Sequence, residues 1–428
     1  MPGFRLILPR HPKTKLTDRG GTVDCGPNIH VPHPPLRSPK HTLDPAAPSP
    51  VTTVAVPKET HAGETRAALV PEHAAKLVKL GARVEVEAGL GLGAGHRDES
   101  YAAAGAAVET DRARLLAAAD IVLTVRKPSH QEVAALRQGA VLAGLLDPFQ
   151  SPDIIAALAA GGVSAISMEL VPRSTRAQKM DVLSSQASLA GYAGVIVAAA
   201  QSDKIFPMMM TPAGTLLPAR VFVIGAGVAG LQAIATAKRL GAKVEAYDTR
   251  AVVEEQVRSL GARFVKIDLG ETGQTEQGYA KALTDEQLRL QREAMTRLCA
   301  ESDVVITAAQ VFGRRAPILV TSEMLDAMRP GSVVVDLAVE SGGNVEDVEP
   351  GQIADRRGVK IVGLTNLPGC VPVHASQMYS SNLTALLEEF WDRDAKELRL
   401  NLEDEIIRGC LVTHAGKIVN AKLASPKP

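Results

Sequence analysis

Three glycines and an aspartate in the middle of the chain have the spacing of a dinucleotide site. The stretch GAGVAG at residues 225–230 matches G-x-G-x-x-G. In that motif the first glycine permits a tight turn, the second lets backbone approach a pyrophosphate, and the third lets helix pack on strand. Asp248 follows Gly230 by eighteen residues, where a carboxylate accepts hydrogen bonds from ribose hydroxyls. We therefore predict nucleotide contacts at Gly225, Gly227, Val228, Gly230 and Asp248.

The glycine motif leaves alternatives open. A glycine turn that binds nothing would not require Asp248, and an FAD site usually has its motif near the start of a chain. Arg250 adds a third alternative, because an arginine near this position can pair with the 2′-phosphate of NADP(H). Since Asp248 stands at the strand end and repels such a phosphate, we expect NAD(H).

The residues around the motif predict the elements that position it. Residues 221–224 form a β-branched and aromatic run typical of a buried parallel strand. A helix is predicted over residues 228–240, stopping at Gly241, and a second strand over Lys243–Tyr247 leads to Asp248. This strand–turn–helix–strand order places the glycines and the aspartate at the carboxyl edge of a parallel sheet, where ligands bind.

The region before the motif has strands and helices of its own but no glycine fingerprint after its first strand. Predicted strands cover residues 52–56, 83–87, 120–125, 140–145 and 163–166, and predicted helices cover residues 72–80, 112–119 and 152–160. Such alternation predicts a doubly wound parallel sheet. We therefore predict an α/β fold of two Rossmann-like domains with a cleft between them, in which the first domain covers a cofactor held by the second.

Composition and termini limit the classes of function. The chain of 428 residues has 47 basic and 47 acidic residues, which argues against a nucleic-acid partner. Its cysteines have no metal-ligand spacing, so we expect reduced thiols and no metal; they are Cys25, Cys299, Cys370 and Cys410. No uninterrupted apolar run is long enough to span a bilayer. We find no nucleophilic triad.

The first fifty residues differ from the rest. They are rich in proline and histidine and lack the apolar region of a secretory signal. We expect a disordered leader or a start codon placed too far upstream, with an organellar transit peptide as the alternative. The first domain is predicted at residues 51–183, completed by about 370–428, and the NAD-binding domain at residues 184–369.

Two longer stretches carry a resemblance to a known family. VPKETHAGETRAALVPEHAAKLVKLGARVEVEAGLG, from Val56, resembles the opening of the family shared by alanine dehydrogenase and the NAD(H)-binding subunit of proton-translocating nicotinamide nucleotide transhydrogenase. MELVPRSTRAQKMDVLSSQASLAGY, from Met168, resembles the transhydrogenase signature closely. The resemblance covers residues 52–420. Similar alanine dehydrogenases have a lysine before a KEP-like turn and a histidine in a YLHLA-like strand end. This chain has VRKP at residues 125–128 and GLLDPF at residues 144–149, so an acid–base group for amine chemistry is missing.

The signature loop at residues 172–181 supplies the expected catalytic residues. The resemblance implies that Arg173, Gln178 and Asp181 lie against the nicotinamide. An arginine fork and a carboxylate suit a carboxamide, and a neutral glutamine suits a transfer that needs no proton donor. Other contacts implied in this loop are Ser174, Thr175 and Arg176, while Ser184, Ser185 and Gln186 are expected to cap the next helix. The alternative is a solvated hinge between domains.

Further contacts are implied downstream. Asp248, Thr249 and Arg250 match the family's D-x-R contact with the adenosine ribose. Gly278 and Tyr279 match its mobile loop, which is shorter here and has one glycine before the tyrosine. Gln291 and Gln310 match further nucleotide contacts, although Gln310 and Phe312 replace the usual leucine and proline. A stretch resembling ASxxYSxNL, residues 375–383, opens a helix expected to cross back to the first domain.

The resemblance implies the NAD(H)-binding alpha subunit of a Re/Si-specific, proton-translocating transhydrogenase. Such a subunit passes hydride between NADH and NADP⁺ bound on a partner subunit, and a membrane-spanning proton-channel subunit couples this to proton movement. We expect a separate homodimeric subunit, peripheral on the cytoplasmic face of the inner membrane, without a span of its own. The alternatives are an NAD-dependent alanine dehydrogenase and a non-catalytic NAD(H)-binding module.

Overall fold

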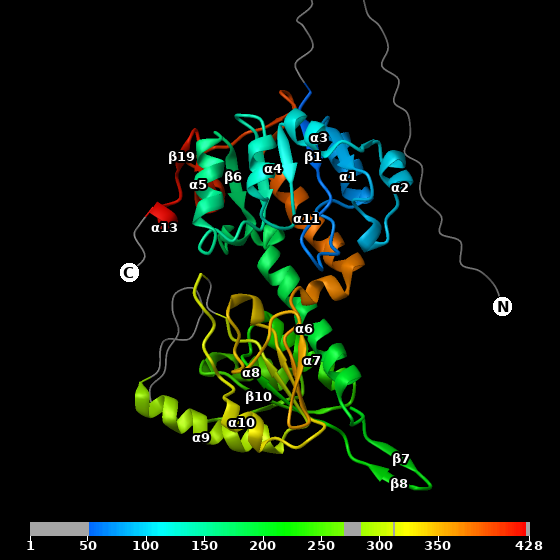
Figure 1. The fold of residues 1–428 in the computed structure, drawn as a ribbon, viewed down its shortest axis with the longest axis vertical. Helices are drawn as coiled ribbons and strands as arrows, with labels where there is room; N and C mark the ends of the chain where they lie inside the picture. Colours follow the sequence, from blue (N-terminus) through cyan, green and yellow to red (C-terminus); the bar gives the residue numbers. More distant parts are fainter. Residues whose placement is uncertain (1–50, 269–283, 311–312, 425–428) are drawn as a thin grey trace, which may run out of the picture. The chain divides into compact units, whose positions relative to one another are not determined.

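Two parallel sheets, each flanked by helices, make up the folded region of the chain (Figure 1). The computed structural model describes residues 51–268, 284–310 and 313–424. The predicted leader lies outside the described residues. The predicted α/β class and the two Rossmann-like parallel sheets are confirmed.

The first sheet has six parallel strands in the order β3-β2-β1-β4-β5-β6, with β18 and β19 added antiparallel beside β6. Its strands are β1 Thr53–Val56, β2 Arg83–Glu87, β3 Ala107–Glu109, β4 Ile121–Leu123, β5 Val141–Gly144, β6 Ser164–Ser167, β18 Leu411–His414 and β19 Lys417–Ile418. Helices in these regions of the chain are α1 Pro71–Lys79, α2 Asp98–Ala103, α3 Arg112–Ala118, α4 His130–Ala135, α5 Pro152–Ala160, α11 Pro372–Phe390, α12 Glu405–Cys410 and α13 Ala421–Ala424. A two-stranded ribbon, β16 Trp391–Asp392 and β17 Glu397–Leu398, follows α11.

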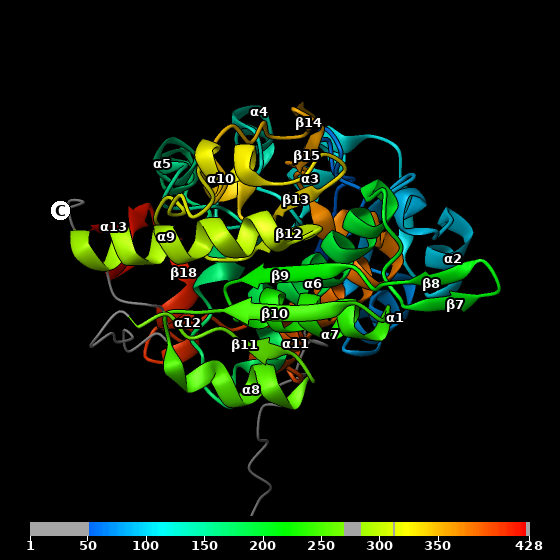
Figure 2. The same cartoon turned by 90° about the horizontal axis from the view of Figure 1, so that it is seen from below.

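The second sheet repeats this strand order as β11-β10-β9-β12-β13-β15, with β14 antiparallel at the edge (Figure 2). Its strands are β9 Arg220–Ile224, β10 Lys243–Tyr247, β11 Arg263–Phe264, β12 Val304–Thr307, β13 Val333–Asp336, β14 Ile353–Arg356 and β15 Val359–Val362. The helices between them are α7 Val228–Arg239, α8 Glu254–Ser259, α9 Asp285–Glu301 and α10 Ser322–Ala327.

Both faces of the second sheet are buried, which explains the continuous apolar run in β9. Val221 and Val223 belong to the apolar cluster that includes residues of α7, whereas Phe222 and Ile224 belong to the cluster that includes residues of α9. Successive side chains of a strand point to opposite faces, so a strand covered on both sides needs apolar residues at every position.

The helix α6, Val182–Gln201, packs against α7, α11 and β13. Gly191 permits the close approach to α7, since a Cβ there would lie 2.2 Å from the carbonyl oxygen of Ala229. Of the described helices, α6 alone is long and apolar enough to cross a bilayer. Of its apolar window, 39% is buried inside the structure.

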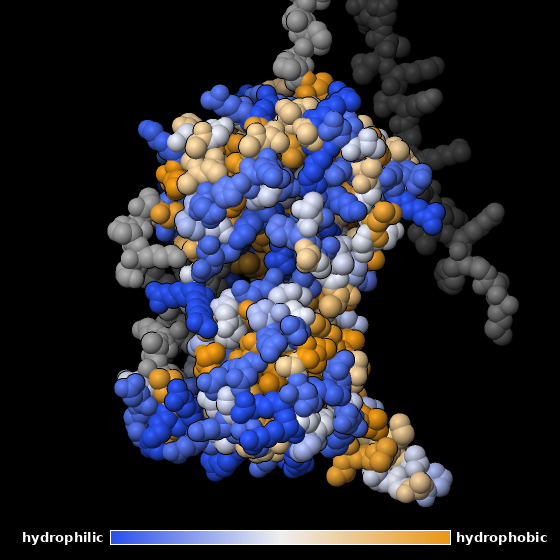
Figure 3. Space-filling model, viewed as in Figure 1, coloured by the Kyte–Doolittle hydropathy of each residue, from blue (hydrophilic) through white to orange (hydrophobic). Residues whose placement is uncertain are grey.

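A short hairpin was not predicted from the sequence. Its strands, β7 Met209–Thr211 and β8 Gly214–Leu216, pair with each other and with no other described strand. Apolar side chains gather on the hairpin and are exposed to solvent (Figure 3). Met210 and Leu217 have exposed fractions of 77% and 68%. This hairpin is therefore a candidate contact surface.

Candidate functional site

The turn between β9 and α7 has the backbone that the glycine motif predicts. Gly225 has a φ of +96°, which side-chain-bearing residues rarely adopt. A Cβ on Gly230 would lie 1.8 Å from the carbonyl oxygen of Gly225, so only glycine fits between helix and turn. Gly227 precedes α7, and a Cβ there would meet no atom within 4 Å. The start of α7 therefore has room beside Gly227, and a helix N-terminus favours anions.

Asp248 lies beside this turn at the end of β10. Its carboxylate accepts hydrogen bonds from the backbone N–H of Ala226 at 2.8 Å and of Arg250 at 2.8 Å. The Arg250 guanidinium also donates to it, from Nε at 2.9 Å and from Nη2 at 2.8 Å. Arg250, which could pair with the 2′-phosphate of NADP(H), is thus bound to Asp248, whose charge would repel such a phosphate.

Two buried polar residues shape the carboxyl edge of the second sheet, and sequence analysis gave neither a role. Asp336 ends β13, and its carboxylate accepts N–H groups of Ala338, Asn344 and Val345. Burial raises the pKa of Asp336 above its ordinary value. The Asn344 amide in turn bonds both the N–H and the carbonyl of Ala309. The signal available was an aspartate at a strand end followed by Gly-Gly-Asn.

Two glutamines expected at the nucleotide have protein partners in this structure. Gln291 lies on α9, is buried, and donates from Nε2 to the Tyr247 hydroxyl at 3.0 Å. Gln310 is exposed, and its Nε2 donates to the Leu337 carbonyl at 3.3 Å. The expected contacts Gly278 and Tyr279 lie outside the described residues, as does Phe312.

The signature loop leads directly into α6. Gln178 opens a short 3₁₀ turn, η3 Gln178–Met180, and its side chain is exposed, as is that of Arg173. Asp181 caps α6: its Oδ1 accepts the Ser184 N–H at 2.9 Å and its Oδ2 accepts the Ser184 hydroxyl at 2.6 Å. The expectation that Ser184, Ser185 and Gln186 cap this helix was wrong, because Asp181 precedes them and caps it instead.

Other side chains of the loop reach the C-terminal region of the chain. The Arg176 guanidinium pairs with Asp404 and with Glu389, 3.3 Å away. Ser174 donates to Glu405 at 3.2 Å, and Thr175 is exposed. Of the loop residues expected at the cofactor, Arg173, Thr175, Arg176 and Gln178 are exposed, and Ser174 and Arg176 bind protein carboxylates.

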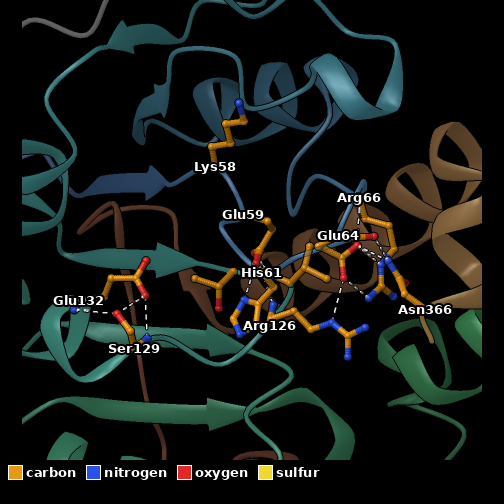
Figure 4. A network of polar contacts seen from close by, with 12 residues as sticks. Lys58, Glu59, His61, Glu64, Arg66, Arg126, Ser129, Glu132 and Asn366 are labelled. Atoms are coloured by element: carbon orange, nitrogen blue, oxygen red, sulfur yellow. Dashed lines mark hydrogen bonds and ion pairs between the residues drawn. The ribbon is translucent and has the colours of Figure 1, made fainter. Parts of the chain in front are cut away.

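The first sheet has a cluster of acids and arginines where its strand order reverses, between β1 and β4 (Figure 4). We call Glu59, Glu64, Arg66 and Arg126 the acid–arginine cluster. Glu59 follows β1 and accepts the backbone N–H of Val125 at 2.5 Å. Glu64 accepts Nε of Arg66 at 2.7 Å and Nε of Arg126 at 2.8 Å. Neither glutamate was predicted from the sequence.

The electrostatics of the cluster favour ionised Glu64. Burial opposes its charge, but hydrogen bonds and the charges of Arg66 and Arg126 outweigh that effect and lower the pKa of Glu64 to about 2. The Nδ2 of Asn366 also donates to this carboxylate at 3.1 Å. The other end of the Arg126 guanidinium pairs with Glu340 at 2.9 Å. Both arginines are therefore held by carboxylates of the chain itself.

Comparison with known proteins identifies the family. Residues 55–190 match the family described as "Alanine dehydrogenase/PNT, N-terminal domain", and residues 194–421 match "Alanine dehydrogenase/PNT, C-terminal domain". A Rhodospirillum rubrum protein named as the first portion of NAD(P) transhydrogenase subunit alpha is 47% identical over 377 residues, which cover 86% of this chain and 98% of that protein.

Solved structures give the same result. A transhydrogenase from Sinorhizobium meliloti superposes with a TM-score of 0.75 at 44% identity, covering 86% of this chain and 99% of that one. An L-alanine dehydrogenase superposes with a TM-score of 0.72 at 26% identity, covering 87% and 98%. The chain therefore belongs to the alanine dehydrogenase/PNT family, as a member of its transhydrogenase alpha subunits.

Proposed function

We propose that this chain binds NAD(H) and presents it for direct hydride exchange with NADP(H) on a partner subunit. The observation that carries the proposal is the turn after β9, where Gly227 leaves open space at the start of α7 and Asp248 stands on the neighbouring strand. The pyrophosphate would bind the N–H groups of this turn, and the adenosine ribose would bind Asp248. Because Asp248 already holds Arg250, the ribose hydroxyls would share or displace that guanidinium.

The nicotinamide would lie against the signature loop, in a cleft between the two domains. The side chains of Arg173 and Gln178 are exposed, and Asp181 is held at the start of α6. We assign Arg173 to the carboxamide and Gln178 to the ribose. Direct hydride transfer needs two C4 atoms close and aligned, and no proton donor. The proposed role of the loop is therefore to position the ring, a contribution that is large in enzymes.

Amino-acid dehydrogenation is the enzymatic alternative, and the charges at the first sheet disfavour it. An amino-acid substrate requires a cation for its carboxylate and an acid–base group for its amine. Arg66 and Arg126 are both paired with Glu64, and Lys127 donates to Ser151 beside Asp147. NADH formation from alanine and NAD⁺ by the isolated chain would favour this alternative.

A reconstitution separates hydride transfer from mere binding. The purified chain is mixed with the NADP(H)-binding subunit of a transhydrogenase, and reduction of an NADP⁺ analogue by NADH is followed in a single turnover. We expect transfer that requires both proteins. NADH binding without transfer would instead identify a non-catalytic binding module.

A substitution in the loop tests the assignment of the active site. Gln178→Asn shortens an exposed side chain outside the packed core. We expect it to slow the single turnover by about 10²-fold, because a displacement of about 1 Å costs this much, while NADH affinity stays nearly unchanged. A parallel loss of NADH affinity would give the loop a structural role instead.

The assembly belongs to the same proposal. The related R. rubrum protein is named as one portion of a subunit alpha, which supports partners for this chain. We propose an NADP(H)-binding subunit and a membrane-spanning proton-channel subunit, with this chain peripheral on the cytoplasmic face of the membrane. Sedimentation with membranes only when the channel subunit is present would support that location.

A second copy of the chain would cover the exposed hairpin. Met208, Met210 and Leu217 expose most of their side-chain surface on β7–β8 and its ends. A homodimer with a two-fold axis would bury the same apolar surface on both copies. Met210→Glu should shift the molar mass measured by light scattering from dimer to monomer, whereas Thr215→Glu, a polar hairpin residue, should shift it less.

A further inference from the structure

The helix α11 has a buried polar face that contacts three separate loops of the first domain. The Ser376 hydroxyl accepts the N–H of Ala67 at 2.9 Å, and the Tyr379 hydroxyl donates to the Thr124 carbonyl at 2.9 Å. These residues belong to the stretch 375–383, which was predicted to open a helix that crosses back to the first domain. Buried polar groups on a helix that also contains Leu383, Leu386 and Leu387 require partners, and here those partners are loop backbone.

The third loop reached by this face is the signature loop. Asn382 is buried, with 8% of its surface exposed. Its Nδ2 donates to the carbonyl of Lys179 at 2.8 Å, and its Oδ1 accepts the Ser185 hydroxyl at 2.8 Å. Lys179 directly follows Gln178, and Ser185 lies in the first turn of α6 beyond Asp181. The Asn382 amide therefore bonds the chain on both sides of Asp181: at Lys179, one residue after Gln178, and at Ser185.

We propose that Asn382 is a positioning residue for hydride transfer: it holds the Lys179 carbonyl and thereby sets the place of Gln178 and Asp181. The inference rests on the proposed function. A 3₁₀ turn of three residues has little stability of its own, so its place depends on contacts with neighbouring elements. Both polar ends of the amide are used, which leaves Asn382 one orientation in which its hydrogen bonds are made.

The test separates positioning from nucleotide binding. Asn382→Asp keeps the shape of the side chain but replaces the donor to the Lys179 carbonyl with an oxygen. We expect single-turnover hydride transfer in the reconstituted complex to slow by about 10²-fold, with the NADH dissociation constant within about twofold of wild type. Ser376→Ala is the matched control, since it removes a buried hydrogen bond from the same face of α11 but to the Ala67 loop. It should leave the transfer rate within about twofold.

A double-mutant cycle distinguishes this role from general destabilisation. If Asn382 acts through Gln178, Asn382→Asp should slow a Gln178→Asn protein by less than about threefold, because the two effects are not additive. Additive effects, or an unchanged rate in a folded Asn382→Asp protein, would overturn the inference while leaving the proposed function intact. Absence of transfer by the wild-type complex would overturn both.

A second variant covers the case in which Asn382→Asp does not fold. Ser185→Ala removes the hydroxyl that donates to Oδ1 and leaves the bond to Lys179 possible. We expect transfer to slow by about three- to tenfold, again without loss of NADH affinity. A wild-type rate in this variant would contradict the proposed role.

Discussion

The two sheets share one strand order and differ at the same place, the point where that order reverses. In the second sheet this point lies between β9 and β12, and the chain after β9 turns through Gly225 and leaves open space at Gly227. In the first sheet it lies between β1 and β4, and the carboxylates of Glu59 and Glu64 occupy the region. We call these places the switch points of the two sheets: that of the second sheet has no side chain at Gly227, whereas that of the first has carboxylates of the protein.

This difference concerns the backbone N–H groups after the first strand of each sheet and the side chains beside them. At the switch point of the first sheet, the backbone N–H of Val125 is bonded to Glu59 and is not available to a ligand. In the second sheet the N–H groups of Gly225 and Ala226 are bonded to the Tyr247 carbonyl and to Asp248, so the difference lies at Gly227. A Cβ on Gly227 would meet no atom within 4 Å. Two sheets of one strand order thus differ in the residues at their switch points, and the fold alone does not imply a function.

The largest expected effect is a loss of unfolding free energy when the acid–arginine cluster is broken. Glu64→Ala removes the carboxylate between Arg66 and Arg126 and leaves their charges without it. Breaking a buried ion pair from one side costs about 3–5 kcal/mol, so urea unfolding should show a loss of this size. NADH affinity of the folded protein should change little, because the turn after β9 is untouched. Glu293→Ala removes an exposed partner of Arg289 on α9 and should not change stability measurably.

The pH dependence of stability tests the same acid–arginine cluster. The pKa of Glu64 falls from 4.5 to about 2 in the folded protein, so its stabilising effect is complete above pH 4.5 and is lost as the pH falls toward 2. The full shift corresponds to about 3 kcal/mol. Unfolding free energies measured between these pH values should decrease less steeply for Glu64→Gln than for wild type. Parallel curves would show that Glu64 is not the group responsible.

A single methyl group added to the glycine turn after β9 should lower the affinity for NADH. Gly230→Ala places a Cβ against the Gly225 carbonyl, so we expect NADH affinity to fall about 10²-fold, or about 2.7 kcal/mol, with a lower melting temperature. Gly227→Ala adds the same methyl group to open space. It should weaken NADH binding without changing the melting temperature of the free protein. Wild-type affinity in Gly227→Ala would place the pyrophosphate elsewhere.

Substitution of Asp248 should have a smaller effect, on the ratio of NADPH to NADH affinity. Asp248→Ser removes the carboxylate that holds the Arg250 guanidinium and would repel a 2′-phosphate. Titration with both nucleotides should show the ratio of NADPH to NADH affinity rising by about 10- to 30-fold, a gain of about 1.4–2 kcal/mol. Asp248→Ser combined with Arg250→Ala is the control and should lose most of this gain. An unchanged ratio would remove Asp248 from cofactor selection.

The smallest effect concerns Glu59. Glu59→Gln keeps an oxygen that accepts the Val125 N–H and removes only the charge. We expect a change in unfolding free energy within about 1 kcal/mol, since the hydrogen bond persists. The variant should also bind a single NADH per chain by calorimetry. Binding of a second NADH molecule per chain would show that the charge of Glu59 alone prevents NADH binding at the first sheet.

Local patterns predicted much of the fold. The run at β9, the glycine turn and the helix α7 follow from neighbouring residues, and Lys243–Tyr247 is the predicted strand without change. The hairpin β7–β8 was missed, because its exposed methionines have no buried face whose period could be recognised. The strand β18 was missed as well, since it pairs antiparallel with β6, about 250 residues earlier in the chain.

The sequence by itself determined the glycine turn, because steric limits on glycine and the spacing to Asp248 act within one βαβ unit. Tertiary structure decided the polar partners. Glu64 meets Asn366 across 302 residues, and Asn382 meets Lys179 across 203. No local pattern encodes such pairs, since each exists only when separate segments fold against one another and bury polar groups that then require partners.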